Sequence, residues 1–139
     1  MYRSETQVRV HYALTDQMGV VYHSRYAEFM EIGRVESLRQ LGFTYKDMET
    51  EGIIMPVTEL QIRFLRPARY DDVVTIATTL REIPHNHKIT FYTEIFNEKK
   101  ELLITGHASL YFMNRNSMTR MNIPKAIADK LKPYFPEEK

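Results

Sequence analysis

A carboxylate, a glycine, a histidine and a helix start fall together in the stretch T-D-Q-M-G-V-V-Y-H at residues 15–23. Gly19 would let the turn adopt positive φ or pass close to a ligand. Asp16 precedes His23 by seven residues, so the turn can fold its carboxylate back toward the free N–H groups of a helix that begins near residue 24. A helix start favours negative charge by roughly 0.3–1 kcal/mol. A ligand carbonyl could be held and polarised between these groups.

Taken alone, the pattern D-x-x-G is short and common, and it favours a plain turn in which Asp16 caps and Gly19 permits the bend. His85 and His87 could suggest a metal ion, but two histidines in a turn without a placed carboxylate favour solvent exposure. The chain has no cysteine, which excludes a disulfide framework and a thiol nucleophile. We predict no metal site and no cofactor.

An amphipathic helix must follow the turn, because apolar or small residues recur every three or four positions. They are Tyr26, Phe29, Met30, Gly33, Ser37, Leu38 and Leu41. The opposite face is charged, and Gly42 is well suited to end the helix in a left-handed conformation.

The rest of the chain changes to a period of two, which is typical of strands. We predict strands at residues 5–13, 60–64, 73–83, 89–96 and 102–113, a short helical turn within 44–52 and a terminal helix at 123–131. Gly106, in the middle of the last strand, predicts a bulge or the close approach of another element.

Short connections between the strands predict antiparallel pairing. We therefore expect an α+β fold, with a curled antiparallel sheet of about five strands wrapped around one long central helix. At 139 residues, the chain is most simply a single domain over 1–139.

Composition limits the partners. The formal net charge of +1 gives no electrostatic reason to expect nucleic acid. No run approaches the ~20 apolar residues of a membrane span, and the N-terminus M-Y-R-S-E-T-Q lacks the apolar stretch of a signal peptide. We predict no membrane span and a cytoplasmic location.

The string V-R-V-H-Y-A-L-T-D-Q-M-G-V-V-Y-H-S-R-Y-A-E-F at residues 8–29, with R-P-A-R-Y-D-D at 66–72, carries a family resemblance. It resembles the hotdog-fold acyl-CoA thioesterases of the 4-hydroxybenzoyl-CoA thioesterase type, and most of all their Tol-Pal-associated bacterial branch. The likeness in element order covers nearly the whole chain. Because T-D-x-x-G-V-V-Y-H is far more specific than D-x-x-G, we favour catalysis over a plain turn. Arg25 departs from the family, whose members typically carry Asn there.

The resemblance implies hydrolysis of an acyl thioester to a carboxylic acid and free coenzyme A. Asp16 would act as nucleophile or as general base on a water, and the backbone N–H of His23 would polarise the carbonyl. The His23 side chain would either bond the carbonyl or a water, or only orient the loop. Tyr12, four residues before Asp16 on the predicted first strand, would hold Asp16 through its hydroxyl or simply pack.

The substrate-binding residues expected from the resemblance are Gly19 and Tyr26 at the turn, with Arg69 and Lys88 for the phosphates of coenzyme A. Lys88 is the first choice for that contact. Hotdog relatives pair their sheets edge to edge, so we expect a homodimer or homotetramer whose sites use both chains.

Two alternatives stay open. A hotdog hydroxyacyl dehydratase would need a helix carboxylate, from Glu28 or Glu31, facing a histidine across the cleft, and it leaves the Asp16 string unexplained. A non-catalytic acyl- or protein-binding module predicts stabilisation by a ligand, with no effect of Asp16→Asn on any activity.

Overall fold

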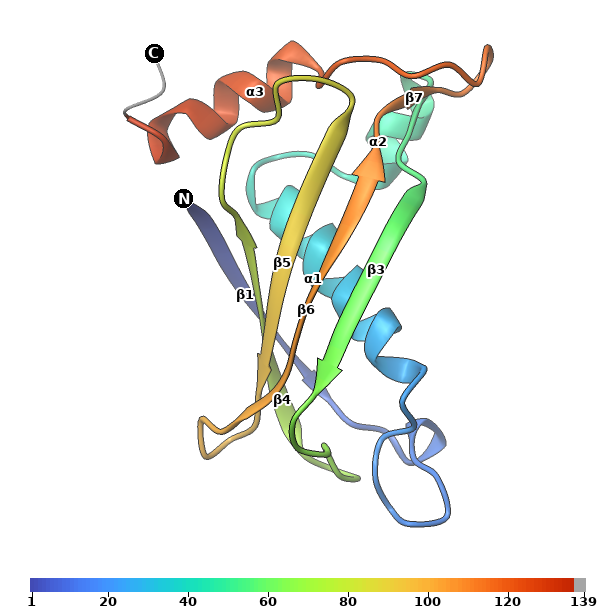
Figure 1. Cartoon of the computed structure of the whole chain (residues 1–139), viewed down its shortest axis with the longest axis vertical. Coiled ribbons are helices and arrows are strands. Elements are labelled where there is room, and N and C mark those ends of the chain that lie inside the picture. The colour runs from blue at the N-terminus through green and yellow to red at the C-terminus, as the bar shows by residue number, and fades with distance from the viewer. Residues whose placement is uncertain (137–139) are drawn as a thin grey trace.

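The computed structural model describes residues 1–136 and contains one main antiparallel sheet. Its five strands are β1 (Tyr2–Arg9), β4 (Val73–Leu80), β5 (Lys88–Phe96), β6 (Leu102–Tyr111) and β3 (Val57–Phe64), in that spatial order (Figure 1). Every neighbouring pair is antiparallel. The predicted antiparallel sheet of about five strands and the mixed α+β class are confirmed.

The remaining elements are short. The helices are α1 (Arg25–Gln40), α2 (Tyr45–Thr50) and α3 (Lys125–Leu131), with 3₁₀ turns η1 (Tyr12–Leu14) and η2 (Lys132–Tyr134). A second, two-stranded sheet joins β2 (Ile53–Ile54) to β7 (Met113–Asn114). Pairs this short leave no periodic pattern in the sequence. None of the helices within residues 1–136 is long and apolar enough to cross a membrane.

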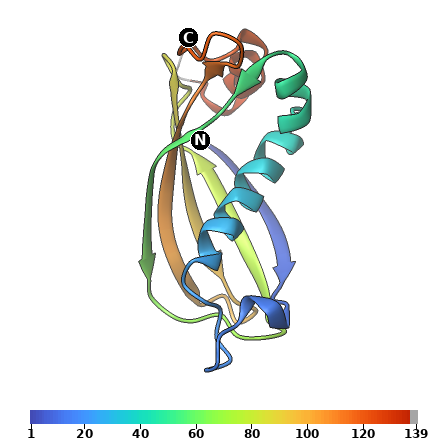
Figure 2. The ribbon, with the colours of Figure 1, turned by 90° about the vertical axis from the view of Figure 1, so that its right-hand side faces the viewer.

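Helix α1 packs along one face of the sheet (Figure 2). Two glycines permit the close approach. A Cβ on Gly33 of α1 would come within 2.7 Å of Ile76 Cγ2 on β4, and one on Gly106 of β6 would come within 3.2 Å of Met30 Cε on α1 and nearer still to the backbone oxygen of Gln61 on β3. The close approach predicted at Gly106 is therefore confirmed.

One long central helix is not evident, which corrects the predicted architecture. The helices are short, and α1, the longest among the described residues, has 16 residues. Gly42 ends it at φ 100°, where the N–H of Phe43 donates to Leu38 O and that of Gly42 to Arg39 O, both at 2.9 Å. This is a Schellman motif, so the left-handed stop predicted at Gly42 is confirmed.

The first strand ends earlier than predicted, and Tyr12 does not lie on it. The N–H of Val10 donates to Asp72 O at 2.8 Å and the N–H of Asp71 donates to Val10 O at 2.9 Å, so the chain leaves β4 here and pairs with a loop. The next residues form η1, in which the N–H of Leu14 donates to His11 O. The side chain of Tyr12 is 76% exposed as a result.

Candidate active site

Residues 15–21 form a tight reversal that is closed by backbone bonds. Thr15 and Val21 face each other in an antiparallel bridge, and the N–H of Asp16 donates to Val20 O at 2.9 Å. Gly19 has φ 77°, in the left-handed region, and its N–H donates to Asp16 O at 3.1 Å. Gly19 thus supplies the positive φ that the turn requires.

The carboxylate of Asp16 is exposed and faces the inside of its own turn. Its Oδ1 accepts hydrogen bonds from the N–H of Met18 at 2.8 Å and of Val20 at 3.4 Å. Both bonds use the same oxygen, which leaves Oδ2 for a water or a ligand. Asp16 therefore closes the turn and still presents a carboxylate oxygen at the surface.

The start of α1 leaves backbone donors open at His23 and Ser24. The N–H of Arg25 donates to Tyr22 O at 2.9 Å, and that of Tyr26 to His23 O at 3.4 Å. Ser24, at the cap position, makes no side-chain cap bond. Within residues 1–136, the N–H groups of His23 and Ser24 have no hydrogen-bond acceptor. They are the free donors that the helix start was predicted to offer.

The loop at residues 65–72 holds the turn against α1. Val20 bridges to Arg69, and the N–H of Val21 donates to Ala68 O at 2.8 Å. The N–H of Ala68 donates in turn to the hydroxyl of Tyr26 at 3.0 Å. Burial raises the pKa of Tyr26, and the bond from Ala68 opposes that rise. The role of Ala68 is invisible in the sequence because it acts through its backbone alone.

The side chains of Tyr12 and His23 lie at the surface near this turn. The Tyr12 ring packs edge to face on Tyr70, with centroids 5.6 Å apart, and the His23 ring lies 4.2 Å from that of Tyr22. In the described part of the chain, the Tyr12 hydroxyl makes no hydrogen bond to Asp16. Tyr12 is thus close in sequence to Asp16 without holding it in this single chain.

The two predicted phosphate contacts lie at opposite ends of the sheet. Arg69, bridged to Val20, borders a hollow of about 500 Å³ with Arg66 and Lys99. Lys88 borders another, of about 490 Å³, with Arg81. Lys88 is the first residue of β5. Phe96, eight residues later on the same strand, pairs with Thr75 near the end of the sheet that carries the turn, so Lys88 and Phe96 are about 26 Å apart along β5. Figure 1 shows the turn at the lower end of the molecule.

The structure thus brings Asp16, Gly19, His23, Tyr26 and Arg69 to one end and leaves Lys88 at the other.

The carboxylates that a dehydratase would require lie on the exposed side of α1. Glu28 pairs with Arg25 at 2.9 Å, and Glu31 is exposed. Within residues 1–136, no group of three or more His, Asp or Glu side chains has the geometry to hold a metal ion.

Known proteins share this arrangement of elements. Residues 8–131 match the model of the family described as "Thioesterase-like superfamily". The chain is similar to the acyl-CoA thioester hydrolase YbgC of Escherichia coli O6:H1, with 30% identity over 125 residues, which are 90% of this chain and 92% of that protein. It is similar also to the 1,4-dihydroxy-2-naphthoyl-CoA hydrolase of Thermosynechococcus vestitus, with 32% identity over 95% of this chain and 90% of that protein.

Among solved structures, the DHNA-CoA thioesterase from Staphylococcus aureus superposes with a TM-score of 0.83 at 35% identity, covering 99% of this chain and 86% of that one. The family match spans far more than half of the chain, and the likeness to solved structures covers nearly all of it. The chain therefore belongs to the thioesterase-like superfamily, and its enzyme class is thioester hydrolase.

Proposed function

We propose that the protein hydrolyses acyl-CoA thioesters to a free carboxylic acid and coenzyme A, at the junction of the Asp16 turn and the start of α1. The observation that carries this proposal is the pair of open N–H groups at His23 and Ser24, beside a turn that presents a carboxylate. Names of the relatives YbgC and 1,4-dihydroxy-2-naphthoyl-CoA hydrolase support the substrate class.

The open amide of His23 would bind the thioester oxygen as negative charge develops on it. A well-aimed donor of this kind is worth about 2.7–4 kcal/mol in the transition state. The helix start adds its own preference for negative charge. The imidazole of His23 is exposed next to the same amide, where it can contact the substrate or a water.

Asp16 supplies the second half of the chemistry by one of two routes. As a general base it removes a proton from a water, the resulting hydroxide adds to the carbonyl carbon, and the C–S bond breaks to release the thiolate, which takes up the proton. As a nucleophile its free Oδ2 attacks the carbonyl, coenzyme A leaves, and water then hydrolyses the anhydride. Positioned acid–base catalysis contributes about 10²- to 10⁴-fold.

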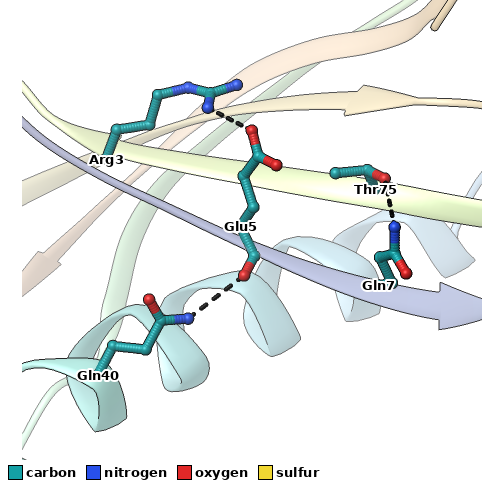
Figure 3. A network of polar contacts seen from close by, with 5 residues as sticks. All are labelled: Arg3, Glu5, Gln7, Gln40 and Thr75. Carbon is teal, nitrogen blue, oxygen red and sulfur yellow. Dashed lines mark hydrogen bonds and ion pairs between the residues drawn. The ribbon is translucent and has the colours of Figure 1, made fainter.

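A second copy of the chain is part of the proposal because the two outermost strands of the sheet, β1 and β3, differ in what they expose. At the β1 edge, the side-chain amide of Gln40 donates to Glu5 O at 3.3 Å, as Figure 3 shows together with the ion pair of Arg3 and Glu5. At the β3 edge, Leu60 and Phe64 are 45% and 53% exposed. An uncovered edge with apolar side chains is a template for pairing with another chain. We therefore propose a dimer formed through β3.

A two-fold axis at β3 would pair the two β3 strands antiparallel. The end that carries Lys88 in one protomer would then lie beside the end that carries Asp16 in its partner. This arrangement reconciles the predicted phosphate contact at Lys88 with its place about 26 Å along β5 from the end of the sheet that carries the turn. Each site would use Asp16, His23 and Arg69 from one chain and Lys88 from the other.

A panel assay tests the proposed reaction. The wild-type protein is incubated with short, long and aromatic acyl-CoA thioesters and with a 3-hydroxyacyl-CoA, while thiol release and enoyl absorbance are followed together. We expect thiol release without enoyl formation. Formation of enoyl product without thiol would support the dehydratase, and binding without turnover of any thioester would support a non-catalytic module.

A further inference from the structure

The buried hydroxyl of Tyr26 ties the first turn of α1 to the loop at residues 65–72. Tyr26 is 2% exposed, and its hydroxyl accepts a hydrogen bond from the N–H of Ala68, which is fully buried. On the other side of the same residue, the carbonyl of Ala68 accepts a hydrogen bond from the N–H of Val21 at 2.8 Å. Ala68 therefore bonds both to the helix and to the turn.

These two bonds enclose the segment that carries the open amides. From Val21 the chain runs through His23 and Ser24 back to Tyr26, so both ends of residues 21–26 are fixed to Ala68. His23 has no hydrogen bond of its own N–H within the described residues. The N–H of Tyr22, next to His23, donates to Leu14 O at 3.0 Å, so the two bonds to Ala68 act on His23 together with this local bond.

The ring of Tyr26 and its hydroxyl have separate tasks. The ring packs edge to face against Phe29 and Phe64, with centroids 5.9 Å and 5.5 Å away. The hydroxyl alone reaches the loop. A phenylalanine would keep the aromatic packing and remove only the acceptor for the Ala68 N–H, which would then be left unpaired in the interior.

We propose that Tyr26 is a positioning residue: its hydroxyl, acting through Ala68, sets where the His23 N–H stands relative to the Asp16 turn. The inference rests on the proposed function of the same site, and it gives Tyr26 a role other than contact with the substrate. A misplacement of about 1 Å at a reacting centre costs about 100-fold in rate. We expect Tyr26→Phe to lower kcat by at least about tenfold and by no more than the about 100-fold of such a misplacement. The KM of the variant should equal that of the wild type within experimental error.

The chain offers a matched control in Tyr2. Its side chain is also buried, and its hydroxyl donates to Ser37 O at 2.7 Å, close to the other end of α1. Tyr2→Phe therefore removes the same phenolic hydroxyl, here from a bond between β1 and α1 that is remote from the Asp16 turn. It should lower stability to a similar extent and leave kcat unchanged.

The experiment measures kcat and KM for both variants, together with hydrogen exchange of the Val21 and Ala68 backbone amides. In Tyr26→Phe we expect faster exchange at Ala68 and a lower kcat, and in Tyr2→Phe neither change. Wild-type kcat in Tyr26→Phe despite faster exchange would overturn the inference, as would an equal loss of kcat in Tyr2→Phe. Absence of thiol release from every thioester by the wild-type protein would overturn the proposed function as well, so the two failures are distinguishable.

Discussion

The Oδ1 of Asp16 accepts a hydrogen bond from the backbone N–H of Met18 at 2.8 Å, so the proposed catalytic carboxylate also closes its own turn. An asparagine at this position keeps an acceptor oxygen for Met18 and removes the charge. We expect Asp16→Asn to lower thioester turnover by at least ~100-fold, the low end of acid–base contributions, with the circular dichroism spectrum unchanged.

Asp16→Ala is the companion variant, since it removes both the charge and the acceptor for the Met18 N–H. It should lose activity and also lower the melting temperature. Retained turnover in Asp16→Asn, with a native spectrum, would rule out the role assigned to Asp16.

Gly19 and Gly42 provide a matched pair for the backbone of the turn. Both have positive φ, at 77° and 100°, and a Cβ at either would have no neighbour within 4 Å. Alanine at either position should cost about 1–2 kcal/mol of unfolding free energy, from the left-handed conformation alone. Only Gly19→Ala should also reduce kcat, because only Gly19 lies in the Asp16 turn. Urea unfolding and thiol-release kinetics measure both effects, and a similar loss of kcat in Gly42→Ala would contradict the assignment.

Leu60→Lys tests the open sheet edge. A lysine there would place an unpaired ammonium in the proposed interface, and burying such a charge costs several kcal/mol. We expect sedimentation velocity to show a monomer for this variant and a dimer or larger species for the wild type, with turnover lost. Gln7→Lys is the control, because Gln7 is exposed on β1, the opposite edge strand. A wild-type monomer at micromolar concentration would contradict the dimer.

Mixing two variants tests whether the Asp16 and the Lys88 of one site come from the same chain or from two different chains. Lys88→Glu should raise KM for acyl-CoA because it places a carboxylate near the coenzyme phosphates, while Asp16→Asn removes turnover. If Lys88 and Asp16 of one site come from different chains, a dimer with one chain of each variant contains one intact site. We expect the co-refolded mixture to show part of the wild-type activity with wild-type KM. A mixture that shows no wild-type KM component argues for a site within one chain.

Alkaline pH should destabilise the fold through its buried and half-buried tyrosines. Burial raises the pKa of Tyr45, and the neighbouring guanidinium of Arg34 opposes that rise. Above the unfolded value of about 10, the unfolded chain loses the Tyr45 proton first, so the stability from the neutral hydroxyl is present below that pH and is lost as pH rises through the folded pKa. Burial likewise raises the pKa of Tyr2 and Tyr26.

We expect urea unfolding at about pH 11 to give a smaller unfolding free energy than at neutral pH. This alkaline loss of unfolding free energy should be smaller in Tyr45→Phe than in the wild type. Tyr70→Phe, at a residue 55% exposed, is the control and should follow the wild type. Equal alkaline losses in Tyr45→Phe and the wild type would contradict the assignment.

The sequence alone determined the features that depend on residues close together in the chain. The spacing from Tyr26 to Leu41 predicted α1, Gly42 predicted its stop, and T-D-x-x-G predicted the tight turn with free amides behind it. Alternation predicted the antiparallel sheet, because a strand's two faces can be read from consecutive residues. Strand ends were less accurate: β1 ends at Arg9, where pairing with the loop near Asp72 displaces the chain.

Only the tertiary structure decided how distant segments meet at the site. The bond between Ala68 and Tyr26 joins residues 42 positions apart, and Lys88 is far from Asp16 because strand order, not sequence distance, sets its place. Such contacts form between backbone groups or between the ends of different strands, so no periodicity or side-chain pattern in the sequence encodes them. The same holds for the exposed apolar side chains of β3, because strand order decides which strands lie outermost in the sheet.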